Sequence, residues 1–128
     1  MPQDLPPFDT PDLARVIEAL PPVMLDRLPY GCIRIDKQQM VALYSEAERQ
    51  LSGSGSRQRL NLHFFTEVAP CMDDPAFRGR ISQALEQGHV DLEFGWVGDF
   101  DDAERSLRVR VQSASGGGCW IFLLREQR

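Results

Sequence analysis

Residues 63–77 place one thiol between a double-aromatic run and an expected helix start, which makes this segment the most suited to chemistry. Asp74 followed by Pro75 predicts that a helix begins there, because Asp caps the free amides and Pro suits the first helical position. Just upstream of that helix, N–H groups and the helix dipole favour a thiolate at Cys71. The pattern indicates covalent attachment of a group to Cys71, and the alternative is a cysteine that only fills the core.

The other cysteines and the overall composition exclude several classes of site. Cys32 and Cys119 lie far from Cys71 and form no C-x-x-C pair, so neither a zinc site nor a disulfide framework is expected, and both are interpreted as core residues. The length of 128 residues and the 42% hydrophobic content suit one soluble globular domain. A net charge of -5 with 14 scattered basic residues argues against nucleic acid as a partner.

The histidines and an acidic stretch indicate no metal site. His63 and His89 are far apart in sequence, and each flanks an apolar stretch, where a hydrogen-bonded histidine is commoner than a ligand. The stretch at 99–104 lacks the glycine and terminal glutamate of a calcium loop, so a solvated loop is expected. His63 is also the only candidate base in the Cys71 segment, which leaves a thiol-dependent enzyme or redox sensor as a minor alternative.

The N-terminal region carries no targeting signal that the sequence reveals. Residues 1–7 show no basic region followed by an apolar run, so a cytoplasmic location is expected, and no stretch is apolar enough for membrane insertion. Thr10-Pro11 then predicts the start of an amphipathic helix, which Pro21-Pro22 ends. A helix this short needs a surface to lie on, so residues 1–27 are interpreted as a detachable cap on a core of residues 28–128, one domain overall.

The remaining chain alternates between strand and helix patterns. We expect a hairpin with strands at 31–36 and 40–44, a short helix at 45–51, a flexible loop at 52–56, and a helix from Asp74-Pro75 that ends at Gly88. Three strands follow, and the last, at 119–124, is apolar on both faces and belongs in the middle of the sheet. The predicted fold is α+β, with a five-stranded antiparallel sheet flanked by helices, in the order of a PAS domain.

Specific residues extend this likeness to one family. The matching positions are Leu25-Asp26, Leu28, Gly31, Ile33, Asp36, Tyr44, Ala47, Glu48, Phe64-Phe65, Val68-Ala69-Pro70-Cys71, Pro75, Phe77, Gly88, Phe94, Asp99, Trp120 and Phe122. On these residues the chain resembles the photoactive yellow protein (xanthopsin) family of PAS-fold blue-light receptors. The resemblance implies a covalent cofactor, p-coumaric acid (4-hydroxycinnamic acid), bound as a thioester to Cys71.

The resemblance also assigns the residues around that cofactor. Tyr44 and Glu48 would donate hydrogen bonds to its buried phenolate, and Ser52 would support Tyr44. The other expected cofactor-binding residues are Ile33, Phe64, Val68, Ala69, Pro70, Met72, Phe77, Gly98, Asp99, Phe100 and Asp102. Without the family match, Glu48 would be read as a solvated helix residue, because Glu is almost never fully buried unless paired.

The implied mechanism places a proton on Glu48. Its pKa would have to be raised well above the usual ~4.3 by burial and by the phenolate. Light would then isomerise the cofactor from trans to cis, and Glu48 would pass its proton to the phenolate. The ionised carboxylate left in the core costs several kcal/mol, against a total domain stability of about 5–15 kcal/mol. Partial unfolding, first of the cap, is therefore the expected signal.

Four positions depart from the family pattern. Ser54 replaces an arginine that covers the pocket, and Asp102 replaces a methionine that helps dark recovery, so a wetter pocket mouth and slower recovery are expected. Gly98 stands where an aromatic ring is usual, and Met72 replaces a small polar residue beside Cys71. These departures leave open an alternative, a light-insensitive PAS module for ligand binding or protein interaction.

The sequence predicts a photosensor and not an enzyme, because the chemistry is confined to its own cofactor. A free single domain has to signal through another molecule, so an unknown downstream signalling protein is the expected partner. The chain itself is expected to be a monomer or a weak dimer.

Overall fold

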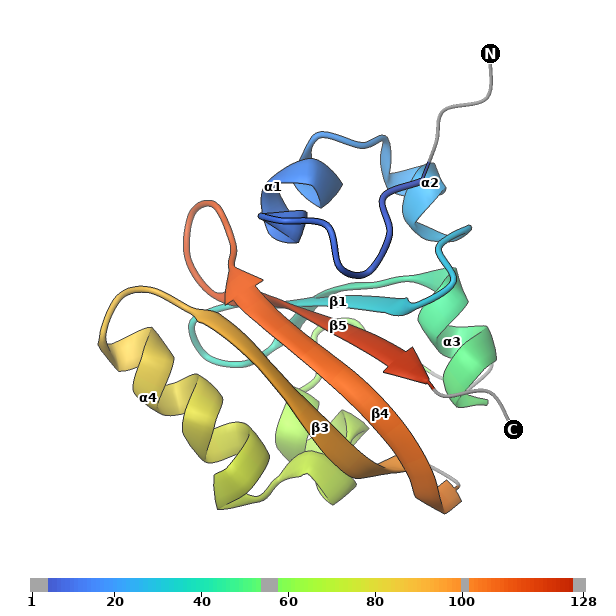
Figure 1. The fold of residues 1–128 in the computed structure, drawn as a ribbon. Helices are drawn as coiled ribbons and strands as arrows, with labels where there is room; N and C mark the ends of the chain where they lie inside the picture. The colour runs from blue at the N-terminus through green and yellow to red at the C-terminus, as the bar shows by residue number, and fades with distance from the viewer. Residues whose placement is uncertain (1–4, 54–57, 100–101, 126–128) are drawn as a thin grey trace.

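A central antiparallel sheet organises the chain (Figure 1). The computed structural model describes residues 5–53, 58–99 and 102–125. The elements are α1 (Leu13–Glu18), α2 (Pro22–Leu25), β1 (Gly31–Ile35), β2 (Val41–Tyr44), α3 (Glu46–Ser52), η1 (Phe64–Val68), η2 (Pro70–Met72), η3 (Pro75–Gly79), α4 (Arg80–Glu86), β3 (Asp91–Asp99), β4 (Asp102–Ser113) and β5 (Cys119–Arg125). The five strands lie in the order β2-β1-β5-β4-β3, which confirms the predicted α+β class.

Strand β5 lies between β1 and β4 and is covered on both faces, as its apolar sequence predicts. On one face, Cys119, Ile121 and Leu123 join the core beneath η1, η3 and α4. On the other face, Trp120 and Phe122 join the apolar cluster beneath α1 and α2. The period-two alternation of a strand therefore sends neighbouring side chains into two separate apolar clusters.

The N-terminal helices are attached to the sheet by polar contacts as well as by apolar burial. Arg110 of β4 donates to the backbone carbonyls of Phe8 and Thr10 at 2.6 and 2.9 Å. The indole N–H of Trp120 donates to the Glu18 carboxylate at 2.9 Å. These bonds cross roughly a hundred residues of sequence, so they form only when the sheet is assembled.

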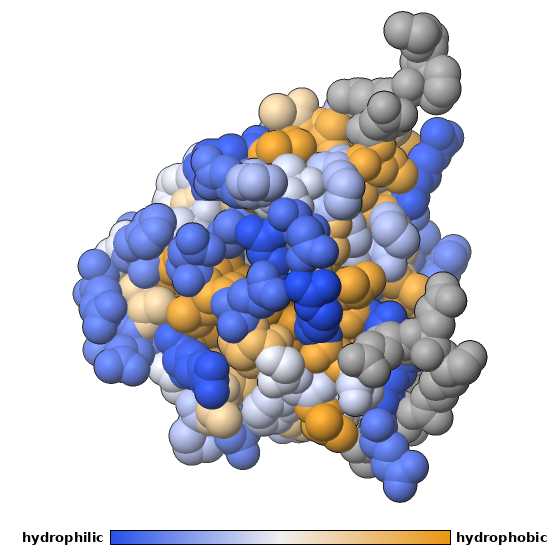
Figure 2. Space-filling view, viewed as in Figure 1, coloured by the Kyte–Doolittle hydropathy of each residue, from blue (hydrophilic) through white to orange (hydrophobic). Residues whose placement is uncertain are grey.

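Charged side chains also lie over the sheet below these helices. Figure 2 shows hydrophilic residues gathered in the middle of this face. Arg108 of β4 pairs with Asp9 at 2.7 Å and with Glu93 at 2.8 Å. Among the described residues, no helix has the length and apolar character needed to cross a membrane.

Several element boundaries differ from the sequence-based prediction. The first helix begins at Leu13, after Asp12 in a left-handed conformation (φ 55°), and not at Thr10-Pro11. Pro22 was expected only to end that helix, but it is also the first residue of the short helix α2. The Asp74 side chain accepts from the Ala76 amide at 2.8 Å and so caps the next helical run, as predicted. That run begins with one π-helical turn, η3, before it continues as α4.

Candidate functional site

Cys71 lies in the short 3-10 helix η2, between the π-helical turns η1 and η3. Its side chain is exposed, whereas Ala69 and Met72 on either side of it are fully buried. The aromatic pair before it, Phe64 and Phe65, is also buried, with the ring centroids 4.9 Å apart. The thiol therefore stands at the surface of a segment that is otherwise anchored in the core.

Tyr44 and Glu48 come together at the junction between β2 and α3. Ser45 caps α3, because its hydroxyl accepts from the Glu48 amide at 3.1 Å, and this directs the first turn of the helix into the sheet. The Tyr44 hydroxyl lies 3.5 Å from Oε2 of Glu48. Glu48 is completely buried, which is opposite to what a helix glutamate suggests by itself.

Arg125, the last residue of β5, holds the Glu48 carboxylate. Its two terminal nitrogens donate to Oε1 and Oε2 of Glu48, each at 2.7 Å. The side chains are 1% and 0% exposed, so this is a fully buried ion pair. A bidentate guanidinium contact favours the ionised carboxylate. The mechanism expected from sequence assigns no partner to that carboxylate, and the structure differs by providing Arg125.

Two more arginines lie against the Tyr44 ring. The guanidinium carbons of Arg49 and Arg59 are 5.3 and 5.9 Å from the ring centroid, within the range of cation–π attraction. Arg59 is also buried. Together with Arg125 they give the neighbourhood of the Tyr44 hydroxyl a positive electrostatic character that suits an anion.

The structure brings seven of the fourteen sequence-predicted cofactor-binding residues into one apolar cluster. Ser52, at the end of α3, is buried, whereas Pro70 is exposed beside Cys71. Gly98 lies at a register shift of β3 with a positive φ of 121°, which favours glycine. The cluster contains Ile33, Tyr44, Phe64, Val68, Ala69, Met72 and Phe77.

Some predicted positions lie outside what the structure describes. Ser54 and Phe100 fall in the undescribed residues, and Asp99 and Asp102 are described only as strand residues, without their side chains. The expected effects of Ser54 and Asp102 on the pocket and on dark recovery therefore stay predictions. Arg125 is the residue that sequence reasoning missed. Its signal was its position two residues after Leu123, on the buried side of a period-two strand.

The contacts and burial of His63, Cys32 and Cys119 indicate structural roles. His63 Nδ1 accepts from the Thr66 amide at 3.3 Å, so this histidine caps η1. Cys32 and Cys119 are fully buried core residues, as predicted. Burial raises the pKa of Cys119 to about 12. Within the described residues, no group of three or more histidine, cysteine, aspartate or glutamate side chains could hold a metal ion.

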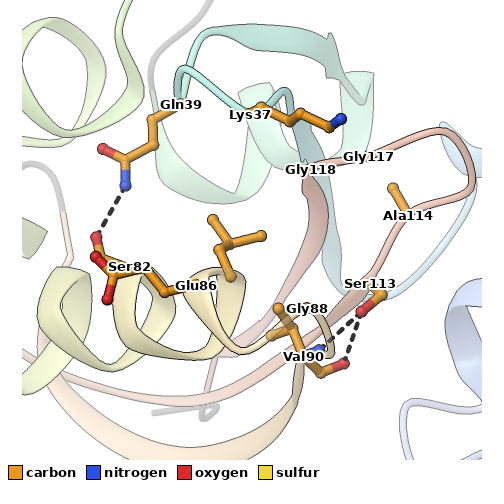
Figure 3. A pocket seen from close by; sticks show the side chains of 11 residues that line it. Lys37, Gln39, Ser82, Glu86, Gly88, Val90, Ser113, Ala114, Gly117 and Gly118 are labelled. Carbon is orange, nitrogen blue, oxygen red and sulfur yellow. Dashed lines mark hydrogen bonds between the residues drawn. The ribbon is translucent and has the colours of Figure 1, made fainter.

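A separate open pocket of about 650 Å³ lies between α4 and the turns that join β1 to β2 and β4 to β5 (Figure 3). Gln39 donates to the Ser82 hydroxyl at 3.0 Å on one side of it, and Lys37 extends along the opposite wall. Its lining includes none of the predicted cofactor residues. The pocket is therefore distinct from the site around Glu48.

Comparison with known proteins decides the family. A photoactive yellow protein domain from the sensor histidine kinase Ppr of Rhodospirillum centenum superposes with a TM-score of 0.73 at 32% identity, covering 84% of this chain and 95% of that one. The chain belongs to the photoactive yellow protein family. The photoactive yellow proteins of Rhodothalassium salexigens and Rhodobacter capsulatus are each 27% identical to it, over 92% and 93% of the chain and 95% and 96% of the relatives. No family model matches the sequence.

The PAS fold is shown independently of close relatives. A PAS domain from Colwellia psychrerythraea superposes with a TM-score of 0.60 at 14% identity, over 89% of this chain and 96% of that one. The prediction of a PAS-fold member of the photoactive yellow protein family is thus confirmed. As such, the chain is a photoreceptor of the photoactive yellow protein type.

Proposed function

We propose that the chain is a blue-light photoreceptor that carries p-coumaric acid as a thioester on Cys71. The observation that carries this proposal is the buried pair of Tyr44 and Glu48, which meets on the same side of the sheet as the core-anchored segment that presents Cys71. One end of an elongated phenolic acid needs a thiol, and the other needs buried donors. Family membership supports both assignments.

The donor set fits an ionisable phenol. A hydroxyl, a carboxyl and a guanidinium converge in a place where Tyr44 is 8% exposed and Glu48 is not exposed at all. A purely apolar ligand would gain nothing from these groups, whereas a buried phenolate requires them. When bound, the cofactor supplies visible absorption and trans–cis isomerisation.

The residues of the chain do the rest of the proposed work. The Cys71 sulfur holds the acyl end, and the Tyr44 hydroxyl and the protonated Glu48 carboxyl donate to the phenolate end, with Ser52 supporting Tyr44. A carboxyl oxygen of Glu48 would hold the proton that the phenolate could accept after light absorption. The proposed signal is partial unfolding, in which residues 1–27 act as a cap that loosens from a core of residues 28–128.

The output is proposed to reach a downstream signalling protein. One solved relative is a domain of a sensor histidine kinase, which supports a signalling partner without naming one for this chain. No substrate turnover is proposed, because relatives of this type are photoreceptors and sensor domains. A cytoplasmic location and a monomeric or weakly dimeric state remain part of the proposal.

Reconstitution tests the function directly. Purified apoprotein is mixed with activated p-coumaric acid, and absorption is recorded before and after a blue flash, with Cys71→Ser as the negative control and Cys119→Ser as the matched thiol control. A visible band that requires Cys71, bleaches in light and returns in darkness supports the proposal. A colourless product would instead favour a light-insensitive PAS module for ligand binding or protein interaction.

A further inference from the structure

The buried pair of Glu48 and Arg125 joins two elements that are far apart in sequence. Glu48 lies in the first turn of α3, and Arg125 ends the central strand β5, 77 residues later. Arg125 continues the row of Cys119, Ile121 and Leu123, which faces the helix-covered core. Both hydrogen bonds are 2.7 Å long, and the two side chains are 1% and 0% exposed.

Other polar groups also lie near Glu48. Tyr44 of β2 contributes a hydroxyl at 3.5 Å, and the hydroxyl of Ser45, the N-cap of α3, accepts from the Glu48 amide. Cys32 of β1 lies in the apolar cluster under α1 and α2, on the other face of the sheet, where burial, followed by the charges of Glu48 and Asp26, holds the pKa of Cys32 far above its usual range. That thiol is therefore neutral.

Two further arginines, Arg49 and Arg59, lie beside Tyr44. The guanidinium groups of Arg49 and Arg59 lie over the face of the Tyr44 ring. The Arg125 guanidinium bonds both oxygens of the Glu48 carboxylate directly.

We infer that Arg125 is the built-in counter-ion of the photocycle, which receives the Glu48 carboxylate after proton transfer and keeps α3 attached to β5 while the cap loosens. The inference rests on the proposed function. In the proposed transfer, a proton leaves a carboxyl oxygen of Glu48 and joins the phenolate oxygen, and no electron moves. Before the transfer the negative charge is on the phenolate, and afterwards it is on Glu48, so the phenol, Glu48 and Arg125 taken together carry no net charge in either state.

This arrangement changes how far the fold opens. An ionised carboxylate without a partner in the core is a strong reason to unfold locally, and two charge-assisted hydrogen bonds from Arg125 lower that cost where α3 meets β5. Removing only Arg125 leaves that carboxylate buried with its counter-charge lost, which is far more costly than removing both members. With Arg125 in place, the opening is confined to elements other than α3 and the end of β5.

The first test uses the apoprotein and does not need the cofactor. Urea unfolding is measured for Arg125→Gln, Glu48→Gln and the double variant, with Arg110→Gln as a matched buried arginine that does not contact Glu48. Arg125→Gln should lower the folding equilibrium constant roughly a hundredfold or more, and the double variant should lose much less than the sum of the single losses. Additive losses would overturn the inference. Arg125→Lys should recover part of the loss, because it restores the charge but not the bidentate geometry.

The second test uses the reconstituted protein. Infrared difference spectra report the Glu48 carboxyl, and hydrogen exchange in light reports the opening. In the unmodified chain Glu48 should lose its proton while α3 and β5 keep their protection, and Arg125→Gln should raise light-dependent exchange in α3 and β5 by about tenfold or more. Equal exchange in Arg125→Gln and Arg110→Gln would overturn the inference. Absence of a visible band would refute the proposed function and with it the role of Arg125 in the photocycle. The urea-unfolding comparison of the single and double variants would still decide whether Glu48 and Arg125 interact in the apoprotein.

Discussion

Gly31 lies directly against the carboxyl group of Glu48. A Cβ atom at Gly31 would overlap Oε1 and would lie 2.7 Å from Cδ, well inside normal contact distance. Gly31 begins β1 and pairs with Leu123 of β5, so its backbone has no room to retreat. On the other side, Arg125 fixes the same carboxyl through both oxygens. A glycine is needed here for space, because the buried ion pair occupies the volume of a side chain.

Gly31→Ala should therefore destabilise the protein by at least the about 1–3 kcal/mol typical of an overpacked core. The methyl group would push Glu48 away from Arg125, and breaking a buried pair adds to the loss. Gly95→Ala in β3 is the control, because its Cβ would meet only an ordinary contact 3.9 Å away. Urea unfolding measures both, and equal stability of the two variants would contradict the packing described here.

Acid should loosen the N-terminal helices through Glu18. Burial alone raises the pKa of this carboxyl, but hydrogen bonds from Trp120 and Ser115 and the charge of Arg15 outweigh it and hold the pKa below the usual 4.5. A lowered pKa in the folded state means that Glu18 stabilises the fold above about pH 4.5. This contribution is lost as the pH falls through the lower, folded-state value.

The protonation of Glu18 can be measured through the fluorescence of Trp120 in a Trp96→Phe background as the pH is lowered. Glu18→Gln should remove the acid-dependent step at Trp120. Glu46→Gln is the matched control, because Glu46 is an exposed helix residue that lies 3.9 Å from Arg49 and does not contact Trp120. A step that persists unchanged in Glu18→Gln would assign the acid transition to another carboxyl.

Cysteine modification should be selective for Cys71. Its side chain is exposed, whereas Cys32 and Cys119 are fully buried and burial raises the pKa of Cys119 to about 12. The folded apoprotein should therefore react with a thiol reagent at one cysteine, at least about a thousandfold faster than at the other two, which require unfolding. Mass spectrometry of timed samples counts the labels, with Cys71→Ser as the control. Rapid addition of a second label would show that a buried thiol is accessible.

The helix after Cys71 should depend on its cap. Asp74→Ala should cost about 1 kcal/mol, because the Asp74 carboxylate accepts from the Ala76 amide at 2.8 Å at the start of η3. The neighbouring Asp73→Ala should cost about 0.5 kcal/mol or less, because its pair with Arg78 is partly exposed. Urea unfolding of the two variants, side by side, tests the difference. A larger loss for Asp73→Ala would reverse the assignment of the cap.

Local sequence patterns were sufficient for much of the fold. The apolar character of both faces of 119–124 predicted the doubly covered central strand, and Asp74-Pro75 predicted the helix start beside Cys71; both are present. The start of the first helix was less well predicted, because Asp12 adopts a left-handed conformation that delays it to Leu13. Boundaries depend on one or two dihedral angles, whereas periodicity is averaged over many residues.

The candidate site also has one part that the sequence predicted and one part that only the tertiary structure decided. The sequence by itself determined which residues carry the thiol, the hydroxyl and the carboxyl, because the order and spacing of Tyr44, Glu48 and Cys71 are properties of the chain. The tertiary structure alone decided that Glu48 is buried against Arg125 and that Gly31 makes room for it. The physical reason is that the cost of burying a charge depends on which partner lies within hydrogen-bond distance. That partner is brought there by the pairing of β1 with β5, across residues far apart in the chain.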